Sequence, residues 1–350
     1  MLRRTLLLFC YAALACSAQD LASKVDEYLN GQKLSGSALL AKGGKTLVSK
    51  GYGMANYELD VPNRPDTKFR LGSITKQFTA TAVLQLQEKG KLNVNDLVSK
   101  YVSDTPETWK DITIHHLLTH TAGLHGYTEL PDYQKRQRER VTPAELISRF
   151  KDLALDFAPG SKWRYSNSGY AVLGYIIEKV SGQSYESFLK ENIFDRLEMH
   201  DSGYDHAAML LKNRASGYEE RPTRVNAEYL DMSIPYSAGS LYSTVEDLYR
   251  WDRALYTDKV LSKESRERMF TPLVKTPNGD LSYGYGWMIG SDNGRRTIQH
   301  GGGINGFSTV IIRYPDQDAC VVVLSNMPSP RFGPIGHRLA TMLLDDSSKH

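Results

Sequence analysis

The sequence predicts an α+β fold in which both ends of the chain build one antiparallel sheet and the middle forms a helical lobe. Strand-like apolar segments gather near the two ends, within residues 37–52 and 283–325. Between them, apolar residues mostly recur at helical spacing, with breaks at Pro and Gly. Strands that follow one another along the chain pair most simply as hairpins, which makes the sheet antiparallel.

The N-terminal part is predicted to contribute a helix and a hairpin. A helix is expected over residues 21–34, followed by strands over 37–40 and 46–52. The sequence Lys42-Gly43-Gly44-Lys45 separates the strands, and a Gly-Gly pair is typical of a tight hairpin turn.

The C-terminal part is predicted to complete the sheet. Strand signals return at residues 283–289, 296–314 and 319–325, and a closing helix is expected over 335–344. We therefore expect a sheet lobe from residues 19–66 and 256–345, and a helical lobe from residues 67–255.

A Ser-x-x-Lys pair lies near the start of the helical middle. Ser73 and Lys76 are three residues apart and precede apolar residues at helical spacing. Residues three apart on a helix share one face, so the Lys76 amine can reach the Ser73 hydroxyl. A serine hydroxyl becomes a good nucleophile when a neighbouring base takes its proton. Alone, such a pair is usually a solvated helix face, so its interpretation depends on two further motifs.

The second motif is Tyr165-Ser166-Asn167, between a Pro- and Gly-containing loop and a helical pattern. A tyrosine at such a junction can point into a cleft. If Lys76 and other cations lower its pKa, its phenolate can act as a general base. Asn167 can offer an amide hydrogen to a substrate carbonyl. Alone, the motif is typical of a turn or helix N-cap.

The third motif is His300-Gly301-Gly302-Gly303, flanked by the alternating apolar residues of a strand or hairpin. Consecutive glycines in a strand let another backbone or a ligand approach closely. A glycine N–H at this edge can join the N–H of Ser73 in an oxyanion hole. Alone, a glycine triplet is most often a tight turn.

The three motifs, in this order, resemble those of the serine β-lactamase and DD-peptidase superfamily. The resemblance is strongest to the branch with class C β-lactamases, D-Ala-D-Ala carboxypeptidases, D-aminopeptidases and β-lactamase-like esterases. It extends over roughly residues 20–344 and includes the flanking stretches 114–124, 238–244 and 283–287. It implies a helix-covered antiparallel sheet beside an all-helical lobe, and we expect no cofactor and no metal.

The resemblance also implies two sets of site residues. The catalytic set is Ser73, Lys76, Tyr165 and His300. The substrate-binding set is Asn167, Gly301, Gly302 and Gly303. Ser73 is expected to be acylated, with Lys76 positioning or deprotonating it. Tyr165 is expected to act as general base and then to protonate the leaving group. The N–H groups of Ser73 and Gly303 are expected to form the oxyanion hole.

His300 stands where β-lactamases usually carry the Lys of a Lys-Thr-Gly motif. A lysine is a permanent point charge, suited to a substrate carboxylate and to lowering the pKa of the tyrosine. A histidine is mostly neutral at pH 7. This departure favours a peptidase or esterase over a β-lactamase, and it predicts that the charge of His300 affects the pH–rate profile.

The leading hypothesis is an exported serine hydrolase that cleaves a D-amino-acid type peptide amide or a carboxylic ester through an acyl-enzyme on Ser73. The expected partner is a small-molecule or peptide substrate, peptidoglycan-derived peptides included. One alternative is a β-lactamase. Another is a non-catalytic penicillin-binding or assembly protein on the same fold, although every catalytic position holds a competent residue.

Composition excludes other classes of function. The chain has 350 residues, 41% hydrophobic and 24% charged, which is the balance of a globular protein with a large core. The formal net charge of +3 gives no indication of nucleic-acid binding.

His116 and His120 are four apart and could share a helix face, as zinc ligands do. No Glu lies between them and no third ligand is evident, so metal binding is disfavoured.

Residues 1–18 have the pattern of a cleaved signal peptide, with two arginines, a short apolar core and small residues up to Ala18. The expected mature domain is 19–345, secreted or periplasmic, without a transmembrane anchor after processing. Lipoprotein cleavage before Cys16 is a minority alternative, because Ala13 is a poor match to such sites. Cys320 lies in a strand-like apolar run and is expected to serve packing.

Overall fold

The structure is a computed structural model that describes residues 19–277, 279–329 and 331–345. The expected signal peptide, residues 1–18, and the alternative lipidation site Cys16 lie outside the described residues. In the described ranges, none of the helices combines the length and the apolar character needed to span a bilayer.

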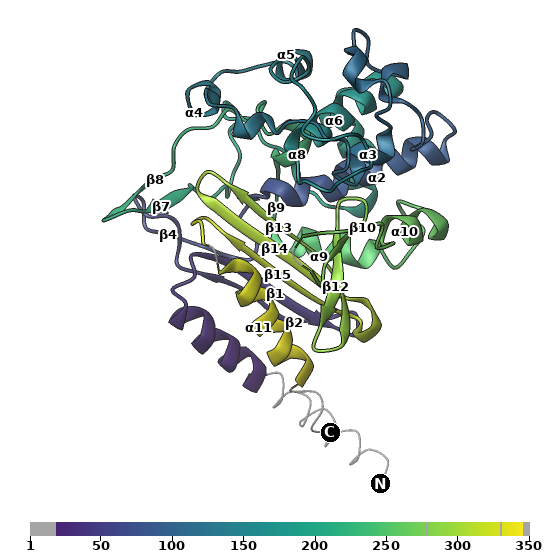
Figure 1. The fold of residues 1–350 in the computed structure, drawn as a ribbon. Helices are drawn as coiled ribbons and strands as arrows, with labels where there is room; N and C mark the ends of the chain where they lie inside the picture. The colour runs from purple at the N-terminus through teal and green to yellow at the C-terminus, as the bar shows by residue number, and fades with distance from the viewer. Residues whose placement is uncertain (1–18, 278, 330, 346–350) are drawn as a thin grey trace.

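An eight-stranded antiparallel sheet forms the centre of the fold (Figure 1), which confirms the predicted α+β class. Its strand order is β10-β11-β12-β13-β14-β15-β1-β2, so the N-terminal hairpin lies beside the last strand of the chain. The strands, in sheet order, are β10 (Val274–Lys275), β11 (Ser282–Tyr283), β12 (Met288–Asp292), β13 (Arg295–Ile304), β14 (Phe307–Tyr314), β15 (Ala319–Ser325), β1 (Gly36–Lys42) and β2 (Lys45–Tyr52).

The strands β14, β15 and β1 are buried on both faces of the sheet, which explains their nearly continuous apolar sequences. All residues of β14 and β15 are buried. Successive side chains point to opposite faces of a sheet. In β15, Val321 and Val323 pack in the core on one face, and Val322 and Leu324 in the core on the other.

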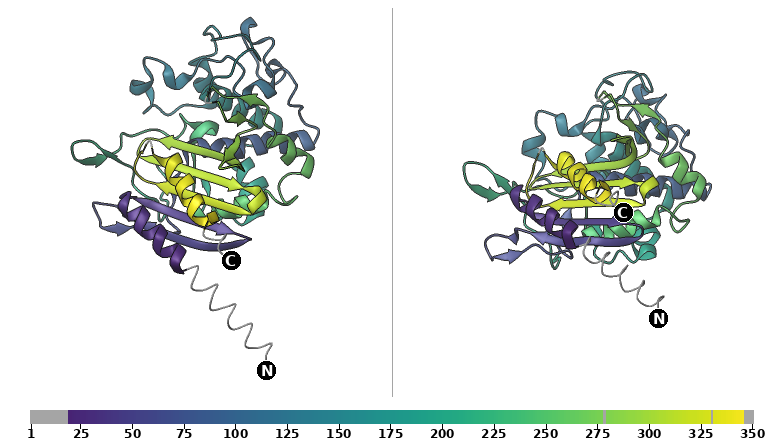
Figure 2. Two further views of the ribbon diagram at one scale, coloured as in Figure 1. Left: turned by 60° about the horizontal axis from the view of Figure 1, so that its bottom comes forward. Right: turned by 90° about the horizontal axis from the view of Figure 1, so that it is seen from below.

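Helices from the two ends of the chain cover one face of the sheet. The described chain begins with a helix over residues 19–31, and α11 (Phe332–Asp345) closes the fold. Both lie on the same side of the sheet (Figure 2) and share a hydrophobic core with alternate residues of β1, β14 and β15. On the opposite face, α9 (Val245–Ala254) packs against β15 and β1.

The middle of the chain is mainly helical and gathers around α2 (Thr75–Glu88). Every residue of α2 from Thr75 to Leu86 is buried, so this helix is surrounded on all sides. The other α-helices of the middle are α3 (Ile114–Leu118), α4 (Tyr133–Arg136), α5 (Pro143–Ser148), α6 (Asn167–Ser181), α7 (Tyr185–Leu189) and α8 (Tyr236–Gly239), and α10 (Lys263–Met269) follows them in the chain. The shorter helical turns are η1 (Gly72–Ile74), η2 (Val98–Lys100), η3 (Glu107–Trp109), η4 (Tyr127–Glu129), η5 (Lys190–Phe194), η6 (Asp195–Leu197) and η7 (Pro315–Gln317).

Short strands in the middle of the chain pair outside the main sheet. One small sheet has the order β5-β9-β6, and β3 pairs with β4 and β7 with β8. Their bounds are β3 (Met54–Asn56), β4 (Val61–Pro62), β5 (Phe69–Arg70), β6 (Gly203–Tyr204), β7 (Tyr218–Glu220), β8 (Arg224–Asn226) and β9 (Leu241–Ser243). The β5-β9-β6 sheet connects the chain just before Ser73 to the segment that follows α8.

The predicted hairpins form, and the structure differs from the prediction in where one strand is interrupted. The β1–β2 hairpin turns at Gly43-Gly44, both with positive φ, as expected. The strand signal at residues 283–289 is wrong as one strand, because it divides into β11 and β12. Gly286, between them, has φ +76° and approaches α2 so closely that a Cβ would lie 2.7 Å from the Lys76 carbonyl oxygen.

A buried ion pair joins α9 to the sheet. The Arg313 guanidinium on β14 donates from Nε to Asp252 Oδ1 over 2.6 Å, and both side chains are almost fully buried. The aromatic rings of Tyr256 and Phe270 lie 4.8 and 5.2 Å from the guanidinium carbon.

We predict that Arg313→Met lowers the free energy of unfolding by about 3–5 kcal/mol, because it leaves the Asp252 carboxylate buried without its partner. The double variant Arg313→Met/Asp252→Leu should recover most of this loss, since the buried charge is removed. Urea denaturation measures both. Equal losses in the single and double variants would contradict the interpretation.

Candidate active site

Ser73 lies on η1, directly before α2, and Lys76 lies in the first turn of α2. The Lys76 Nζ is 3.1 Å from the Ser73 Oγ. The expectation that the two side chains share one face and meet is therefore met by the geometry.

The Lys76 amine is completely buried and has two further oxygen neighbours. Nζ lies 2.8 Å from Asn167 Oδ1 and 2.8 Å from the carbonyl oxygen of Ala238. Burial lowers the pKa of Lys76 well below its ordinary value. A neutral amine has two N–H groups and one lone pair, so it can donate to both oxygens and accept a proton from Ser73.

Two aromatic rings flank the same amine. The ring centroids of Tyr165 and Tyr170 lie 4.8 and 5.4 Å from Lys76 Nζ. An ammonium in this place is attracted to the ring faces. The surroundings thus favour a neutral lysine in the free protein while offering some stabilisation to its protonated form.

Tyr165 is half-buried at the end of the loop that precedes α6. Its Oη is buried and makes no hydrogen bond to any described residue. Burial raises the pKa of Tyr165 above its ordinary value, and the neighbouring Ser73 hydroxyl offsets only part of this rise. The expectation that cations lower the pKa of this tyrosine is therefore wrong, because the loss of solvent dominates. Tyr165 carries its phenolic proton at neutral pH.

His120 packs against Tyr165 and was not expected in the site. Its ring centroid is 4.3 Å from that of Tyr165, and its Nδ1 accepts a hydrogen bond from the Ser166 N–H over 3.2 Å. It has a φ of +61°, which is costly for a residue with a side chain. The Nε2 is buried without a hydrogen-bond partner among the described residues.

The idea that His116 and His120 share a helix face does not hold. The helix α3 ends at Leu118, and the left-handed backbone at His120 turns its ring toward Tyr165. His116 Nδ1 instead accepts from the Thr113 N–H and caps α3. Within the described residues, no group of three or more His, Cys, Asp and Glu side chains could hold a metal ion.

His300 lies on β13, buried behind the glycine triplet. Its Nδ1 donates to the Gly301 carbonyl oxygen over 2.6 Å, because a carbonyl can only accept. Nε2 then accepts from the Tyr283 hydroxyl at 3.2 Å. Burial, with a smaller effect from the nearby Lys76, lowers the pKa of His300 to about 4. The histidine is therefore neutral at pH 7, as the sequence indicates.

The glycine triplet lies where β13 loses one of its partners. The strand β12 pairs with β13 only as far as Gln299, so the outer edge of residues 300–304 has no strand beside it. The turn η1 lies over the face of β13 and β14 beside this edge. A Cβ on Gly72 would be 2.9 Å from the Gly303 nitrogen, and a Cβ on Gly302 would be 2.0 Å from the Leu71 oxygen.

A cavity of about 140 Å³ opens at this junction. Of the predicted residues, Ser73, Asn167 and Gly303 line it. Lys76 and His300 lie buried behind it and Tyr165 lies half-buried beside Lys76, whereas Gly301 and Gly302 are not part of its lining. The structure therefore brings the catalytic set together, and it places Gly302 in a packing position against the Leu71 backbone.

Sequence reasoning missed His120, Tyr283 and the Ala238 carbonyl. Each lies in a stretch that contributes to the family resemblance. Residue type alone, however, does not reveal the role of a backbone carbonyl or of a packed aromatic ring. Tyr285 and Trp287, in the flanking stretch 283–287, pack in the core and do not line this cavity. They are almost fully buried, and Tyr285 Oη contacts His115 Nδ1 at 2.8 Å.

A family model described as Beta-lactamase matches residues 21–342. The chain belongs to the beta-lactamase family. Among curated proteins, this beta-lactamase family member is 32% identical over 326 residues to the putative penicillin-binding protein PbpX of Bacillus subtilis. That match covers 93% of this chain and 79% of PbpX.

Solved structures of family members have the same fold. The octameric penicillin-binding protein homologue from Pyrococcus abyssi superposes with a TM-score of 0.81 at 31% identity, over 93% of this chain and 77% of that one. A D-stereospecific amidohydrolase from Streptomyces sp. superposes with a TM-score of 0.74 at 26% identity, over 89% and 94% of the two chains. These relatives place the chain in the serine hydrolase superfamily.

We predict that Gly302→Ala lowers the free energy of unfolding by about 1–3 kcal/mol, because its Cβ would meet the Leu71 backbone and the Thr309 hydroxyl. The matched control is Gly301→Ala, whose Cβ has its nearest neighbour at 3.5 Å. Thermal and urea unfolding measure the difference. Equal stability of the two variants would show that the close approach is not a constraint.

We predict that protonation of His300 destabilises the fold in acid. The folded-state pKa of about 4 is below the ordinary 6.5, so the unfolded chain takes up the proton first. The stability from neutral His300 is complete above pH 6.5 and is lost as pH falls toward 4. Over that interval His300→Gln should lose about 3 kcal/mol less than the wild type. The exposed His200→Gln is the control, and a wild-type slope in His300→Gln would refute the prediction.

Proposed function

We propose that this protein is a serine hydrolase that cleaves a D-amino-acid type peptide amide or a carboxylic ester through an acyl-enzyme on Ser73. The observation that carries the proposal is the buried amine of Lys76, 3.1 Å from the Ser73 hydroxyl. A neutral amine in hydrogen-bond reach of a serine is the base that a weak nucleophile needs.

Acylation begins when Ser73 Oγ attacks the substrate carbonyl carbon and its proton passes to Lys76 Nζ. The carbonyl oxygen gains negative charge and faces the N–H groups of Ser73 and Gly303. Asn167 accepts from Lys76 with Oδ1, which directs its Nδ2 away from the lysine. Asn167 lines the cavity with Ser73, and its Nδ2 donates one N–H to Thr128 Oγ1 over 3.3 Å, which leaves the other N–H for a substrate.

The leaving group departs with a proton from Tyr165. The bond between the carbonyl carbon and the leaving nitrogen or oxygen breaks as the Tyr165 phenol donates its proton, and Lys76 returns the serine proton to Tyr165. A water molecule then attacks the acyl-enzyme, and its proton reaches Ser73 Oγ by the same two groups. Because Tyr165 is protonated in the free protein, it serves as acid first and Lys76 as base.

The neighbours of the site favour amide or ester substrates over β-lactams. The unpaired outer edge of β13 beside Ser73 suits an extended peptide, which can add to it as a strand. Neutral His300 offers no positive charge for the carboxylate that a β-lactam carries. The similarity to a D-stereospecific amidohydrolase agrees with amide substrates. We also propose that the protein is exported, on the evidence of residues 1–18 and its penicillin-binding relatives.

Time-resolved intact-mass spectrometry with a penicillin, beside panels of small esters and D-amino-acid amides, tests the proposal. We expect Ser73→Ala to lose covalent labelling and to reduce hydrolysis by at least roughly 10³-fold. The exposed Ser161→Ala is the matched control and should behave as wild type.

The lifetime and the identity of the adduct decide among the alternatives. A persistent penicilloyl adduct on Ser73 supports a penicillin-binding peptidase, and one that clears with turnover of the drug supports a β-lactamase. Ester or amide turnover without an adduct supports a pocket that rejects the bicyclic lactam. Unchanged hydrolysis in Ser73→Ala, or no reaction with any substrate, would overturn the mechanism.

A further inference from the structure

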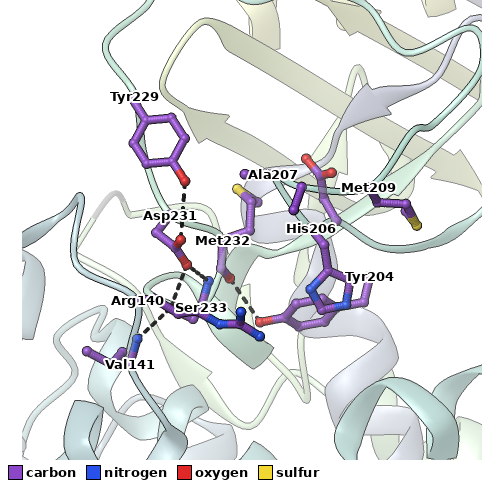
Figure 3. Close-up of a pocket in the computed structure, with 12 residues that line it drawn as sticks. Arg140, Val141, Tyr204, His206, Ala207, Met209, Tyr229, Asp231, Met232 and Ser233 are labelled. Carbon is purple, nitrogen blue, oxygen red and sulfur yellow. Dashed lines mark hydrogen bonds between the residues drawn. The ribbon is translucent and has the colours of Figure 1, made fainter.

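A second cavity of about 390 Å³ adjoins the cavity at Ser73. The two share Asn305, which lies in the turn between β13 and β14. The side chains that give the second cavity its character are Arg70, Arg214, Asn226, Glu228, Tyr229 and Phe307. Tyr229 also lines a third cavity of about 500 Å³ (Figure 3). The second cavity therefore lies next to the position of a substrate held at Ser73.

Two arginines of the second cavity share one buried carboxylate. Arg70 donates from Nε to Asp205 Oδ2 over 2.6 Å, and Arg214 donates from Nη1 to Asp205 Oδ1 over 2.7 Å. Asp205 is completely buried. One carboxylate balances only one of the two guanidinium charges, so this triad, defined as Arg70, Asp205 and Arg214, has a net charge of +1.

The triad retains unused hydrogen-bond donors. Arg70 bonds only through Nε, and Arg214 only through Nη1, which also reaches the His206 carbonyl oxygen. The remaining guanidinium nitrogens donate to no described residue, and both side chains are partly exposed where they line the cavity. Guanidinium donors of this kind fit a carboxylate in a bidentate geometry.

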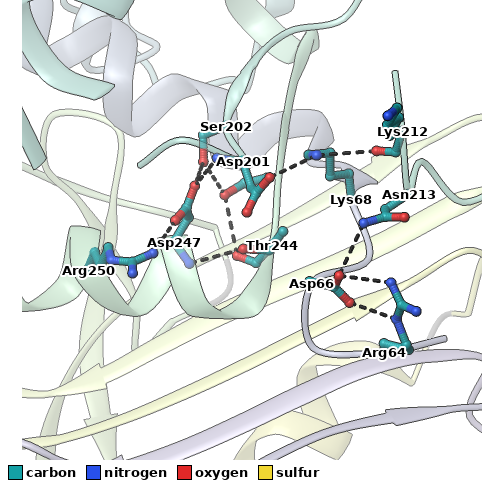
Figure 4. Close-up of polar contacts among 11 residues, drawn as sticks. Arg64, Asp66, Lys68, Asp201, Ser202, Lys212, Asn213, Thr244, Asp247 and Arg250 are labelled. Atoms are coloured by element: carbon teal, nitrogen blue, oxygen red, sulfur yellow. Dashed lines mark hydrogen bonds and ion pairs between the residues drawn. The ribbon is translucent and has the colours of Figure 1, made fainter. Parts of the chain in front are cut away.

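The backbone holds both arginines in place. The Lys68 N–H donates to the Asn213 carbonyl oxygen over 2.8 Å, and the Ala215 N–H donates to the Lys68 carbonyl oxygen over 3.0 Å. The Lys68 ammonium also pairs with Asp201 at 2.8 Å (Figure 4). Since the guanidinium groups are fixed by Asp205 as well, little side-chain freedom is lost when an anion binds.

The one acidic side chain that lines the second cavity has its own partners. Glu228 pairs with Arg221 at 3.6 Å and accepts from Gln137 Nε2 at 3.3 Å. Arg221 pairs more closely with Glu219, at 2.8 Å, so it balances the charge of Glu228 only in part. No ion pair joins Glu228 to Arg70 or Arg214 among the described residues, so the free N–H donors of the two arginines remain available to a ligand in the second cavity.

We propose that the second cavity is a carboxylate subsite, in which Arg70 and Arg214 bind an anionic group of the acyl chain or peptide whose carbonyl reacts at Ser73. The inference rests on the proposed hydrolase function and adds the substrate class, acidic acyl or peptide substrates. His300, near the reacting carbonyl, offers no positive charge to a ligand. The cationic triad lies in the next cavity, so a negative charge on the substrate is recognised at a distance from that carbonyl.

The test compares p-nitrophenyl monoesters of adipic and suberic acid with the same compounds capped as neutral methyl esters. We expect kcat/KM of the better monoester to exceed that of its capped analogue by about tenfold, through KM, and the ratio to fall with added salt. Arg214→Gln should reduce this ratio by about tenfold. Arg250→Gln, which also removes an arginine paired with a buried aspartate (Asp247, Figure 4), should retain the wild-type ratio.

A ratio near one in the wild type, or an unchanged ratio in Arg214→Gln, would overturn the subsite. If Arg214→Gln does not fold by circular dichroism, Arg214→Lys retains the charge but loses the fork, and its ratio should still fall. Calorimetry of free suberate with Ser73→Ala separates the two proposals. Binding that requires Arg214 without any ester turnover supports the subsite and refutes the hydrolase. Turnover that requires Ser73 but has the same kcat/KM for the charged and the capped esters refutes only the subsite.

Discussion

The close approach of one turn of backbone to the face of one strand is the constraint on which the rest of the site depends. The turn η1 carries Ser73, and its contact with β13 requires that Gly72 and Gly302 have no side chains, since their Cβ atoms would lie 2.9 and 2.0 Å from backbone atoms across the contact. The Thr309 hydroxyl donates to the Leu71 carbonyl oxygen over 2.7 Å and fastens the turn from the neighbouring strand. A serine placed in this way has a lysine one helical turn behind it and a free strand edge in front of it.

Burial then determines the protonation states around that serine. Lys76, His300 and the Oη of Tyr165 are buried, and burial is the largest cause of the shift in the pKa of each group. Burial disfavours the charged form of all three groups. Positive charge appears instead at the Arg70–Asp205–Arg214 triad, where a carboxylate partner and partial exposure make it tolerable.

The parts of the fold with a strong local signal could be predicted from the sequence. The Gly-Gly hairpin, the apolar strands β14 and β15 and the closing helix depend on turn chemistry and burial that residue types reveal. The meeting of Ser73 and Lys76 follows from helical spacing. The lowered pKa expected for Tyr165 failed because a pKa depends on solvent exclusion by residues distant in sequence. The left-handed backbone at His120 and the break at Gly286 likewise arise from contacts that only the assembled fold provides.

The pairing of β1 with β15 has a consequence for the order in which the molecule assembles. Ser35 and Asn326 form a hydrogen bond although 291 residues separate them, and the strands beside them, β1 and β15, are paired along their whole length in the sheet. Contacts of such long range form slowly, because the entropy cost of closing a large loop comes before the contacts can stabilise the fold. The hairpin that bears His300 and the glycines adds to that same sheet through β14. A chain still emerging during synthesis therefore lacks a finished centre until nearly its last residues are present, which confines any reactive serine to the complete molecule.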